Sequence, residues 1–282
     1  MPSPTPHWVS LTHDAVSGIE AIRAHFTGHA YDPHFHDSYL VGVTEQGVQQ
    51  FHSRRQRHRS RPGTSFLLEP GDLHDGDAID EQGFTYRMLY LAPQWLQAEM
   101  ANIWQDKLPA GELQFAATLA QDKRLAAAVF HACQTFFDDE SALIKEAGLQ
   151  QLLTNLVRHQ RWFSPQRVAA APRLAYALRD YLCDNLAENI TLQQAAHALQ
   201  ADRFRLTRAF QAEFGLSPHA WLIQKRLNAA RQMLACGMQP AAVAFQTGFA
   251  DQSHLGRWFR RAFQLTPARY RQRCTNLPDV AS

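Results

Sequence analysis

Cysteine is scarce in this chain and long apolar runs are missing, and both absences narrow the possible classes of protein. The four cysteines are widely spaced, without a C-x-x-C pair: Cys133, Cys183, Cys236 and Cys274. This spacing favours free, buried thiols in a reducing cytoplasm over a disulfide framework or a zinc site. No apolar run reaches the ~18 residues of a membrane span, and the first residues lack the pattern of an export signal. The sequence therefore predicts a cytoplasmic protein without a membrane partner.

Catalytic signatures are also missing. The sequence has no G-x-S-x-G, H-E-x-x-H or G-x-x-x-x-G-K-[ST] motif, and no G-x-G-x-x-G that follows a strand. Nucleophile elbows, zinc proteases, P-loops and dinucleotide folds depend on such local patterns. We therefore expect a protein that is not an enzyme and that needs no cofactor.

Charge is distributed unevenly along the 282 residues, a length that suggests two domains. From Arg173 onward the chain has 14 Arg and Lys against 7 Asp and Glu, whereas residues 1–172 have 14 against 19. The C-terminal part is therefore basic and the N-terminal part acidic, although the net charge of the chain is only +2. A basic domain favours a nucleic-acid partner where a binding motif coincides with the charge.

The N-terminal part carries the patterns of short strands. Residues 1–30 are poorly patterned and predict an extended arm, whereas strands are predicted at residues 39–44, 64–68 and 84–90. In the last of these, four side chains alternate and predict a buried aromatic face: Phe84, Tyr86, Met88 and Tyr90. We expect a small β-barrel or sandwich. The basic stretch RRQRHRSR at 54–61 is interpreted as a solvated hairpin, with a second nucleic-acid contact as the alternative.

Helical patterns follow the strands, at residues 94–104, 122–137 and 141–163. The longest carries an apolar stripe, Leu149, Leu152, Leu153 and Leu156. We interpret the stripe as core packed on the β-unit, with a helix–helix dimer contact as the alternative. Residues 164–172, SPQRVAAAP, are bracketed by prolines and predict a linker between a domain at 1–163 and a domain at 173–282.

The C-terminal domain is predicted to be all helix, and part of it is repeated. Helices are expected at residues 174–186, 192–199, 203–214, 218–235, 240–247, 252–263 and from 267. A shift of 49 positions aligns Leu206, Arg208, Phe210 and Pro218 with Leu255, Arg257, Phe259 and Pro267. We interpret this match as an internal duplication of a helix-turn-helix with one basic, polar face. The phenylalanines of both copies are expected in the core: Phe210, Phe214, Phe259 and Phe263.

The second copy contains two specific motifs: G-F-x-D-Q-S-H-hydrophobic-x-R-x-F begins at Gly248, and T-P-x-x-Y-R begins at Thr266. In these motifs it resembles the AraC/XylS family of bacterial transcription regulators. The first copy is similar to the more variable partner motif, and residues 226–234 are similar to the connecting helix of the family. The resemblance covers roughly the last hundred residues. One position departs from it, because Gln264 stands where the family, like the first copy at Gly215, has glycine.

The resemblance implies a regulator that binds double-stranded DNA through two recognition helices. Residues 218–235 would form a helix of ~27 Å at 1.5 Å per residue, which suits major-groove segments about one turn, or ~34 Å, apart. The residues expected to read bases are Phe204, Thr207, Arg208, Gln252, Ser253 and Arg257. Those expected to contact phosphates are Arg203, Arg205, Lys225, Arg260 and Arg261. A homodimer and a contact with RNA polymerase are further implied.

Two short motifs in the N-terminal part resemble those of the cupin barrel, H-x-H and P-x-G-x-x-H. The similar stretches here are Pro33–His36 and Pro70–His74, which contain His34, His36 and His74. In AraC-type regulators this barrel commonly senses a ligand, which implies an α+β protein with an effector pocket at His34, His36, His74 and Tyr39. Three imidazoles can also hold a metal with an open site. However, Leu40 and Val41 stand where a metal cupin has its glutamate, and Glu45 lies too far along. We therefore expect no bound metal, with the three histidines as weak candidates.

Three functions compete at this point. The leading hypothesis is a transcription regulator controlled by a small-molecule effector, which requires the effector to bind two states of the protein unequally. The alternatives are a metal-dependent cupin enzyme with an accessory DNA-binding domain, and a structural DNA binder without an effector. Metal analysis tests the second, and a steep salt dependence with little sequence discrimination would indicate the third.

Overall fold

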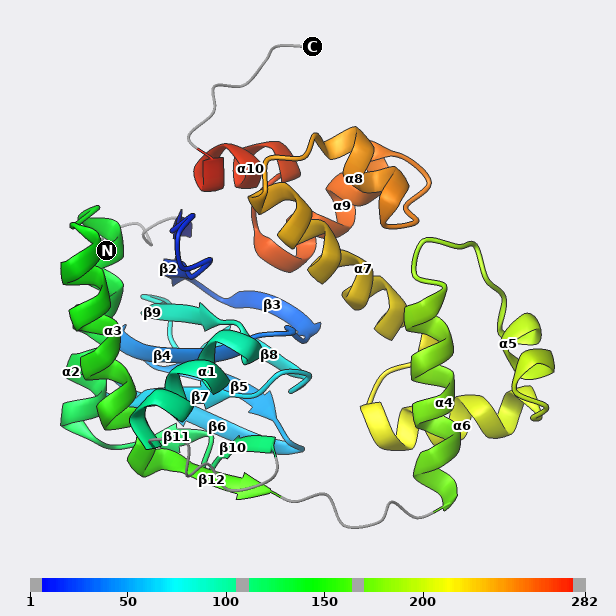
Figure 1. Cartoon of the computed structure of the whole chain (residues 1–282), viewed down its shortest axis with the longest axis horizontal. Helices are drawn as coiled ribbons and strands as arrows, with labels where there is room; N and C mark the ends of the chain where they lie inside the picture. The colour runs from blue at the N-terminus through cyan, green and yellow to red at the C-terminus, as the bar shows by residue number, and fades with distance from the viewer. Residues whose placement is uncertain (1–6, 105–111, 164–169, 276–282) are drawn as a thin grey trace. The chain divides into compact units, whose positions relative to one another are not determined.

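The computed structural model describes residues 7–104, 112–163 and 170–275. The chain divides into two compact units, Met1–Ser164 and Pro165–Ser282 (Figure 1). Of the predicted linker, residues 164–169 lie outside the described residues, and helix α4 begins at Ala170, so the last three linker positions are helical. None of the helices in the described ranges is both long and apolar enough to cross a membrane.

Unit 1 contains two main antiparallel sheets. The larger has the strand order β1-β2-β9-β4-β7-β11, and the smaller has the order β3-β8-β5-β6. The strands are β1 (Trp8–His13), β2 (Glu20–Phe26), β3 (His29–His34), β4 (Tyr39–Gln46), β5 (Gln49–Ser53), β6 (Gln56–Ser60), β7 (Ser65–Leu68), β8 (His74–Ala78), β9 (Phe84–Leu91) and β11 (Leu119–Ala120). A small third sheet pairs β10 (Glu112–Phe115) with β12 (Gln160–Phe163). The sequence predicted either a barrel or a sandwich, and the described strands form an open sandwich.

Strand β9 lies inside the larger sheet and separates two apolar cores. One face carries the predicted aromatic set, which packs in the core between the sheets: Phe84, Tyr86, Met88 and Tyr90. On the other face, Leu89 and Leu91 belong to the core beneath the helices. Every residue of β9 is buried, because this strand is covered on both sides. The predicted buried aromatic face is therefore confirmed, and the opposite face is buried as well.

Helices cover the outer face of the larger sheet (Figure 1). They are α1 (Pro93–Trp104), α2 (Lys123–Phe137) and α3 (Ala142–Leu156). Helix α2 begins after Asp122, whose carboxylate accepts the backbone N–H groups of Arg124 and Leu125. The leucine stripe of α3 is buried in the same core as the outer face of the sheet: Leu149, Leu152, Leu153 and Leu156. The stripe is thus core, as predicted, and has no surface left for a dimer contact.

Three sequence expectations were wrong. Residues 7–30 are not an arm, because they form β1, β2 and the start of β3. The helix predicted at 141–163 ends at Leu156 and is followed by a 3-10 turn and β12. Strand β12 exists because it pairs with β10, a contact that helical periodicity does not report. The four cysteines are free, but Cys183 and Cys236 are exposed.

The basic stretch 54–61 forms the turn and second strand of the β5–β6 hairpin. Arg54 and Arg55 occupy the turn with φ of 51° and 61°, the left-handed conformation of a tight hairpin turn. The Arg54 guanidinium pairs with Glu69 at 2.6 Å and with Asp72 at 3.0 Å. The predicted hairpin is confirmed, and a nucleic-acid contact there stays a hypothesis.

The described part of unit 2, residues 170–275, is all helix and connecting turns, as predicted. Its helices are α4 (Ala170–Asp184), α5 (Leu192–Ala198), α6 (Arg203–Phe214), α7 (Pro218–Ala235), α8 (Pro240–Gln246), α9 (Gln252–Phe263) and α10 (Pro267–Thr275). The bounds of α6, α7 and α9 are those predicted. Pro218, Pro240 and Pro267 each stand first in a helix, where the missing N–H of proline costs no hydrogen bond.

Candidate nucleic-acid interface and ligand site

Helices α6 and α9 have the same construction. Both have 12 residues, and both begin after an aspartate that caps the helix. Asp202 accepts the backbone N–H of Arg205 at 2.9 Å, and Asp251 accepts that of His254 at 2.7 Å. Each cap satisfies one of the N–H groups that a helix start leaves unpaired. The two helices are therefore fixed in the same way at the end that enters a groove in a helix-turn-helix.

One face of each helix is core. The residues with 0% exposure are Leu206 and Phe210 in α6, and Leu255 and Phe259 in α9. Phe214 and Phe263 are half-buried and lie near Trp221 and Tyr270, with ring centroids 6.0 Å and 6.4 Å apart. The phenylalanines thus serve packing, as the sequence predicts. The opposite face of each helix is consequently turned to solvent.

The residues predicted to read bases lie mostly on these exposed faces. Five of the six are exposed: Phe204, Arg208, Gln252, Ser253 and Arg257. Thr207 is half-buried, and its hydroxyl donates to the carbonyl oxygen of Arg203 at 2.9 Å. Among the described residues, Arg208 and Arg257 form no ion pair with an acidic side chain. Their guanidinium groups are therefore available to an anionic or hydrogen-bonding partner.

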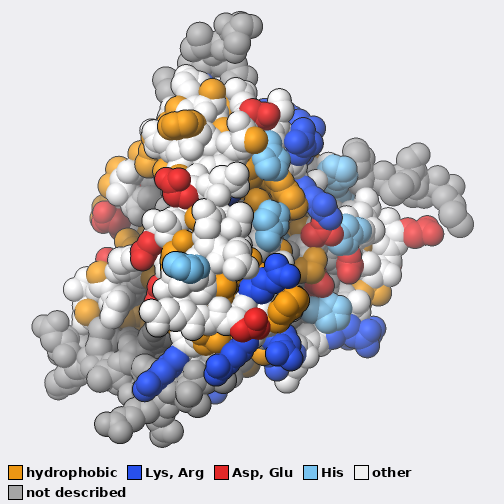
Figure 2. Space-filling view, turned by 90° about the vertical axis from the view of Figure 1, so that its right-hand side faces the viewer, with side chains coloured by type: hydrophobic (Ala, Val, Ile, Leu, Met, Phe, Trp, Pro, Cys, Tyr) orange, Lys and Arg blue, Asp and Glu red, His pale blue; other side chains and the backbone are white. Residues whose placement is uncertain are grey.

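The residues predicted to contact phosphates show one exception. Four are exposed: Arg203, Arg205, Arg260 and Arg261. Lys225 is half-buried, with its ammonium nitrogen 5.9 Å from the centre of the Trp221 ring. Figure 2 shows several Lys and Arg side chains across the lower part of the face that it views. Exposed cations of this kind suit a polyanion.

Arg226 of α7 links the loop between α4 and α5 to the turn of the second helix-turn-helix copy. Its guanidinium donates to the carbonyl oxygens of Leu186 and Glu188, each at 2.8 Å, and to that of Gly248 at 2.7 Å. A Cβ at Gly248 would lie 2.8 Å from this guanidinium, so glycine is needed for the close approach. Burial lowers the pKa of Arg226 from its ordinary value. This role of Arg226 was not predicted from the sequence, although the residue lies in the stretch similar to the family's connecting helix.

In unit 1 the three predicted histidines come together. His34 ends β3, His36 follows it, and His74 begins β8. One ring nitrogen of each lies within 4.8 Å of the others, and all three residues are buried. The ring centroids of His34 and His74 are 4.4 Å apart, and that of His36 is 4.8 Å from His34. We call this group the histidine cluster.

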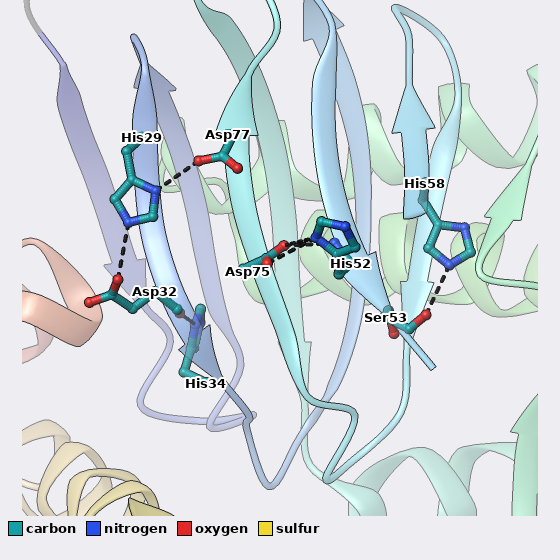
Figure 3. A network of polar contacts seen from close by, with 8 residues as sticks. All are labelled: His29, Asp32, His34, His52, Ser53, His58, Asp75 and Asp77. Carbon is teal, nitrogen blue, oxygen red and sulfur yellow. Dashed lines mark hydrogen bonds and ion pairs between the residues drawn. The ribbon is translucent and has the colours of Figure 1, made fainter. Parts of the chain in front are cut away.

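Backbone carbonyls fix two of these rings. His34 Nδ1 donates to the carbonyl oxygen of Asp32 at 2.8 Å, and His74 Nδ1 donates to that of Asp72 at 2.8 Å. A carbonyl oxygen can only accept, so Nδ1 carries the proton and Nε2 the lone pair. Figure 3 shows His34 with Asp32 on the strand that also carries His29. On that strand His29 lies between Asp32 and Asp77 and is hydrogen-bonded to both. These contacts raise the pKa of His29, and the largest cause is the hydrogen bond with Asp77.

Two tyrosines contact the histidine cluster, and a glutamine contacts one of them. Tyr31 lies edge-on to His34, with ring centroids 5.2 Å apart, and Tyr90 lies edge-on to His36 at 5.1 Å. The Tyr31 hydroxyl accepts a hydrogen bond from Gln49 Nε2 at 2.9 Å. Burial raises the pKa of Tyr31 and lowers the pKa of His74 to about 4, since burial disfavours charged forms. Tyr31, Gln49 and Tyr90 were missed, although the alternation in β9 already indicated an aromatic interior.

Tyr39 and Glu45 lie elsewhere. Tyr39 packs in the core beneath the helices, and its hydroxyl donates to the carbonyl oxygen of Leu113 at 2.7 Å. It shares the outer face of β4 with Val41 because strand residues alternate, so it is not a lining residue of the space between the sheets. Glu45 forms ion pairs with Arg23, at 2.9 Å, and with Arg87. Its carboxylate is therefore engaged away from the histidines, in line with the prediction that Glu45 is not the glutamate of a metal cupin.

Comparison with known proteins agrees with this arrangement. Residues 16–157 match the family model of the AraC-like ligand binding domain, and residues 195–273 match that of a helix-turn-helix domain. The HTH-type transcriptional regulator YbfI of Bacillus subtilis is 28% identical over 241 residues, which cover 84% of this chain and 86% of YbfI. The arabinose operon regulatory protein of Escherichia coli is 24% identical over 259 residues, or 86% of this chain and 84% of that protein.

A solved structure has the same fold over nearly the whole length. ToxT from Vibrio cholerae in its apo form superposes with a TM-score of 0.57 at 12% identity, covering 97% of this chain and 99% of ToxT. A ligand-binding domain match over half of the sequence, together with two helix-turn-helix copies and full-length relatives that are regulators, identifies the family. The chain belongs to the AraC/XylS family of transcription regulators.

Proposed function

We propose that this regulator recognises a bipartite DNA site, with one part read by α6 and the other by α9. The proposal depends on one observation above all. Arg208 and Arg257 occupy equivalent positions in the two helices and are both exposed, without an acidic partner among the described residues. An exposed arginine on a recognition helix can bind guanine through two hydrogen bonds.

The other exposed residues divide between readout and positioning. Gln252 can pair with adenine and Ser253 with several bases, while Phe204 offers an apolar contact for a thymine methyl. The hydroxyl of Thr207 is already bonded within the helix, so its methyl group is the part left for contact. The arginines at 203, 205, 260 and 261 are assigned to phosphates, which fix register without reading sequence. Lys225 is the weakest member of that set because it is half-buried.

The effector site is assigned to the histidine cluster and the aromatic side chains beside it. The cluster lies between the two sheets, where Tyr31 and Tyr90 offer apolar surface and hydrogen-bonding groups together. Such a mixture is typical of small-molecule sites. Tyr39 is left out of the assignment because it packs under the helices. One solved structure of ToxT is bound to (E)-4-(8-methylnaphthalen-1-yl)but-3-enoic acid, with a TM-score of 0.58 to this chain at 10% identity.

A homodimer, a contact with RNA polymerase and action in the cytoplasm complete the proposal. Large apolar side chains are exposed on the helices of unit 1: Phe130 at 43%, Leu143 at 75% and Ile144 at 42%. Such side chains are candidates for a protein contact. Sedimentation should show a dimer that Leu143→Glu weakens, whereas Val16→Glu, at a side chain 89% exposed outside these helices, should leave it unchanged.

The DNA proposal is tested by recovering genomic fragments on the full-length protein and sequencing them. We expect a shared motif with two conserved segments about one helical turn apart, and specific binding ~10³-fold or more tighter than binding to bulk DNA. Recovery of fragments without a common motif, together with equal competition by bulk DNA, would instead indicate a binder without sequence preference.

A further inference from the structure

The β5–β6 hairpin concentrates positive charge on a part of the chain that is acidic as a whole. Five of the eight residues at 54–61 are arginines, and none is acidic. Residues 1–172 contain 14 Arg and Lys in all, against 19 Asp and Glu. Charge of one sign gathered this closely creates a local positive potential, even where the net charge of the surrounding domain is negative.

Strand β6 is held in place by the side chains of its inner face. His58 stacks on Phe51 with ring centroids 5.2 Å apart, and its Nε2 donates to the carbonyl oxygen of Ser53 at 3.2 Å (Figure 3). Ser60 is fully buried, and its hydroxyl oxygen lies 2.7 Å from that of Thr44 on β4. Because strand residues alternate between faces, the residues between and after these two anchors point to solvent.

Three arginines consequently form one row on the outer face, which we call the arginine row. Its members are all exposed: Arg57, Arg59 and Arg61. Arg61 directly follows the last residue of β6 and continues the alternation. Alternate side chains of a strand are ~6.8 Å apart, so the row is ~14 Å long. It lies at an edge of its sheet, because the strand order is β3-β8-β5-β6.

The arginine row has no acidic partner, in contrast to the arginine that begins the hairpin turn. Arg54 pairs with Glu69 at 2.6 Å and with Asp72 at 3.0 Å. Within residues 7–104, 112–163 and 170–275, no carboxylate forms an ion pair with the row. Arg59 Nε donates to the side-chain oxygen of Gln50 at 3.2 Å, a neutral partner that leaves the positive charge uncompensated.

The acidic side chains on the outer face of the same sheet belong to β8, two strands away from β6. Asp75 accepts the backbone N–H of His52 at 2.6 Å, and Asp77 lies 2.7 Å from Nδ1 of His29 (Figure 3). Both carboxylates thus have histidine partners of their own. The outer face therefore keeps its uncompensated positive charge at the β6 edge.

A nucleic-acid backbone has the chemistry and the spacing that such a row can bind. B-DNA carries one phosphate per ~3.4 Å of helix axis on each strand, so a row of ~14 Å faces several of them. A guanidinium binds phosphate oxygens through two parallel hydrogen bonds. The two units are consecutive in one chain, so DNA held by unit 2 presents phosphates to unit 1 at a high effective concentration.

We propose that the arginine row of unit 1 contacts the phosphate backbone of the DNA that unit 2 reads. The contact adds affinity without reading sequence, because phosphate oxygens carry no sequence information directly. This inference rests on the proposed DNA recognition for its partner. It gives the basic stretch 54–61 both of the roles considered from the sequence, a hairpin and a second nucleic-acid contact.

The test compares full-length wild type with the triple variant Arg57→Gln, Arg59→Gln, Arg61→Gln, on the recovered DNA fragments, between about 50 and 200 mM salt. Each phosphate contact contributes about 0.9 to the slope of log affinity against log salt, so the slope should fall by up to ~2.7. Over that range the wild type should then lose up to ~40-fold more affinity than the variant. The base preference should be unchanged.

Two further variants separate the row from charge in general. Lys123→Gln, Arg124→Gln, Arg158→Gln removes the same charge from exposed positions elsewhere in unit 1, and should change the slope by less than ~1. Replacing the arginine row with three lysines keeps the charge and should keep most of the slope, since lysine also binds phosphate as a point charge. Thermal unfolding checks that all variants are folded, which the exposure of the changed residues favours.

An unchanged slope in the glutamine variant of the row, or an equal fall in the charge-matched control, would overturn the proposal. Binding to phosphatidylserine vesicles that the row variant loses, with DNA binding unaffected, would also overturn it and assign the row to a membrane surface. A shared DNA motif with an unchanged slope would refute the arginine row alone. A reduced slope on fragments without a shared motif would support the row and contradict sequence-specific recognition.

Discussion

The two helix-turn-helix copies have the same core and different surfaces. Fully buried residues recur at positions 49 apart, Leu206 with Leu255 and Phe210 with Phe259. Exposed positions have changed, since Phe204 corresponds to Ser253 and Arg203 to Gln252. Packing restricts the buried positions, because a close-packed interior tolerates few changes in side-chain volume. The exposed positions are free to differ with what each copy contacts, which is why we expect two unlike half-sites.

The largest effect is expected from the paired core phenylalanines. Phe210→Ala and Phe259→Ala should each lower the free energy of unfolding by about 3–5 kcal/mol, because each removes a fully buried ring. Urea unfolding of unit 2, followed by circular dichroism of the full chain, gives the measurement. Losses of similar size would confirm that the copies have equivalent cores, and a loss below ~1 kcal/mol in one of them would contradict it.

The next effect concerns Arg226, which bridges the loop before the first copy and the turn of the second. Arg226→Met removes three hydrogen bonds to the carbonyl oxygens of Leu186, Glu188 and Gly248, and bonds to charged groups contribute about 1.5–3 kcal/mol. We expect a loss of that order in stability. We also expect Arg226→Met to lose more affinity for the two-part site than for either half-site alone. Arg226→Lys is the control, because it keeps the charge but cannot reach three carbonyls at once; full stability in Arg226→Met would refute the role.

The exposed arginines Arg208 and Arg257, which occupy equivalent positions, test whether the two copies read different parts of the DNA site. Arg208→Ala and Arg257→Ala should each cost about 1–3 kcal/mol of specific DNA binding and relax the preference at one position, in different halves of the site. Arg260→Ala is the contrast, since loss of a phosphate contact should weaken all sequences alike and reduce the salt slope by about 1. Titrations at several salt concentrations on variant sites decide between the roles. A uniform loss for Arg257→Ala would make it a phosphate contact.

The smallest effect is expected where the two copies end. Gly215 and Gln264 both cap a recognition helix in the left-handed region, with φ of 73° and 56°. An L-residue with a side chain is strained there by roughly 1–2 kcal/mol. Glycine avoids this strain, but part of the gain is offset because glycine has more conformational freedom in the unfolded chain. Gln264→Gly should therefore stabilise unit 2 by up to ~1 kcal/mol, and Gly215→Gln should destabilise it similarly. Thermal unfolding measures both, and an unstable Gln264→Gly would show that the glutamine side chain itself stabilises the turn.

The helices of unit 2 could be predicted closely because their signals are local. Aspartate caps, first-turn prolines and apolar spacings of three and four lie within a few residues of one another, as do the hydrogen bonds that they accompany. The strands of unit 1 were predicted less well. β1 is half-buried at five of its six positions, and the buried positions of β2 do not alternate. β12 is a strand only through its pairing with β10.

The candidate sites differ in the same way. The exposed faces of α6 and α9 follow from the spacing of Leu206, Phe210 and their counterparts, so Arg208 and Arg257 could be placed from the sequence. Tyr39 could not, because the sequence does not tell which of the two faces of β4 lines the space between the sheets when both are buried. Gln49 of β5 donates to the hydroxyl of Tyr31 on β3, which lies against His34; this contact between separate strands has no local signal.

By itself, the sequence determined the duplicated reader, its caps, its exposed arginines and the family to which the chain belongs. Those features are encoded within single helices, where each residue's neighbours are three or four positions away. The tertiary structure alone decided that Tyr39 packs beneath the helices, that β9 separates two cores and that Arg226 bridges two loops. Each of these depends on strand pairing or packing between segments that lie tens of residues apart, and such contacts are chosen by the folded chain as a whole.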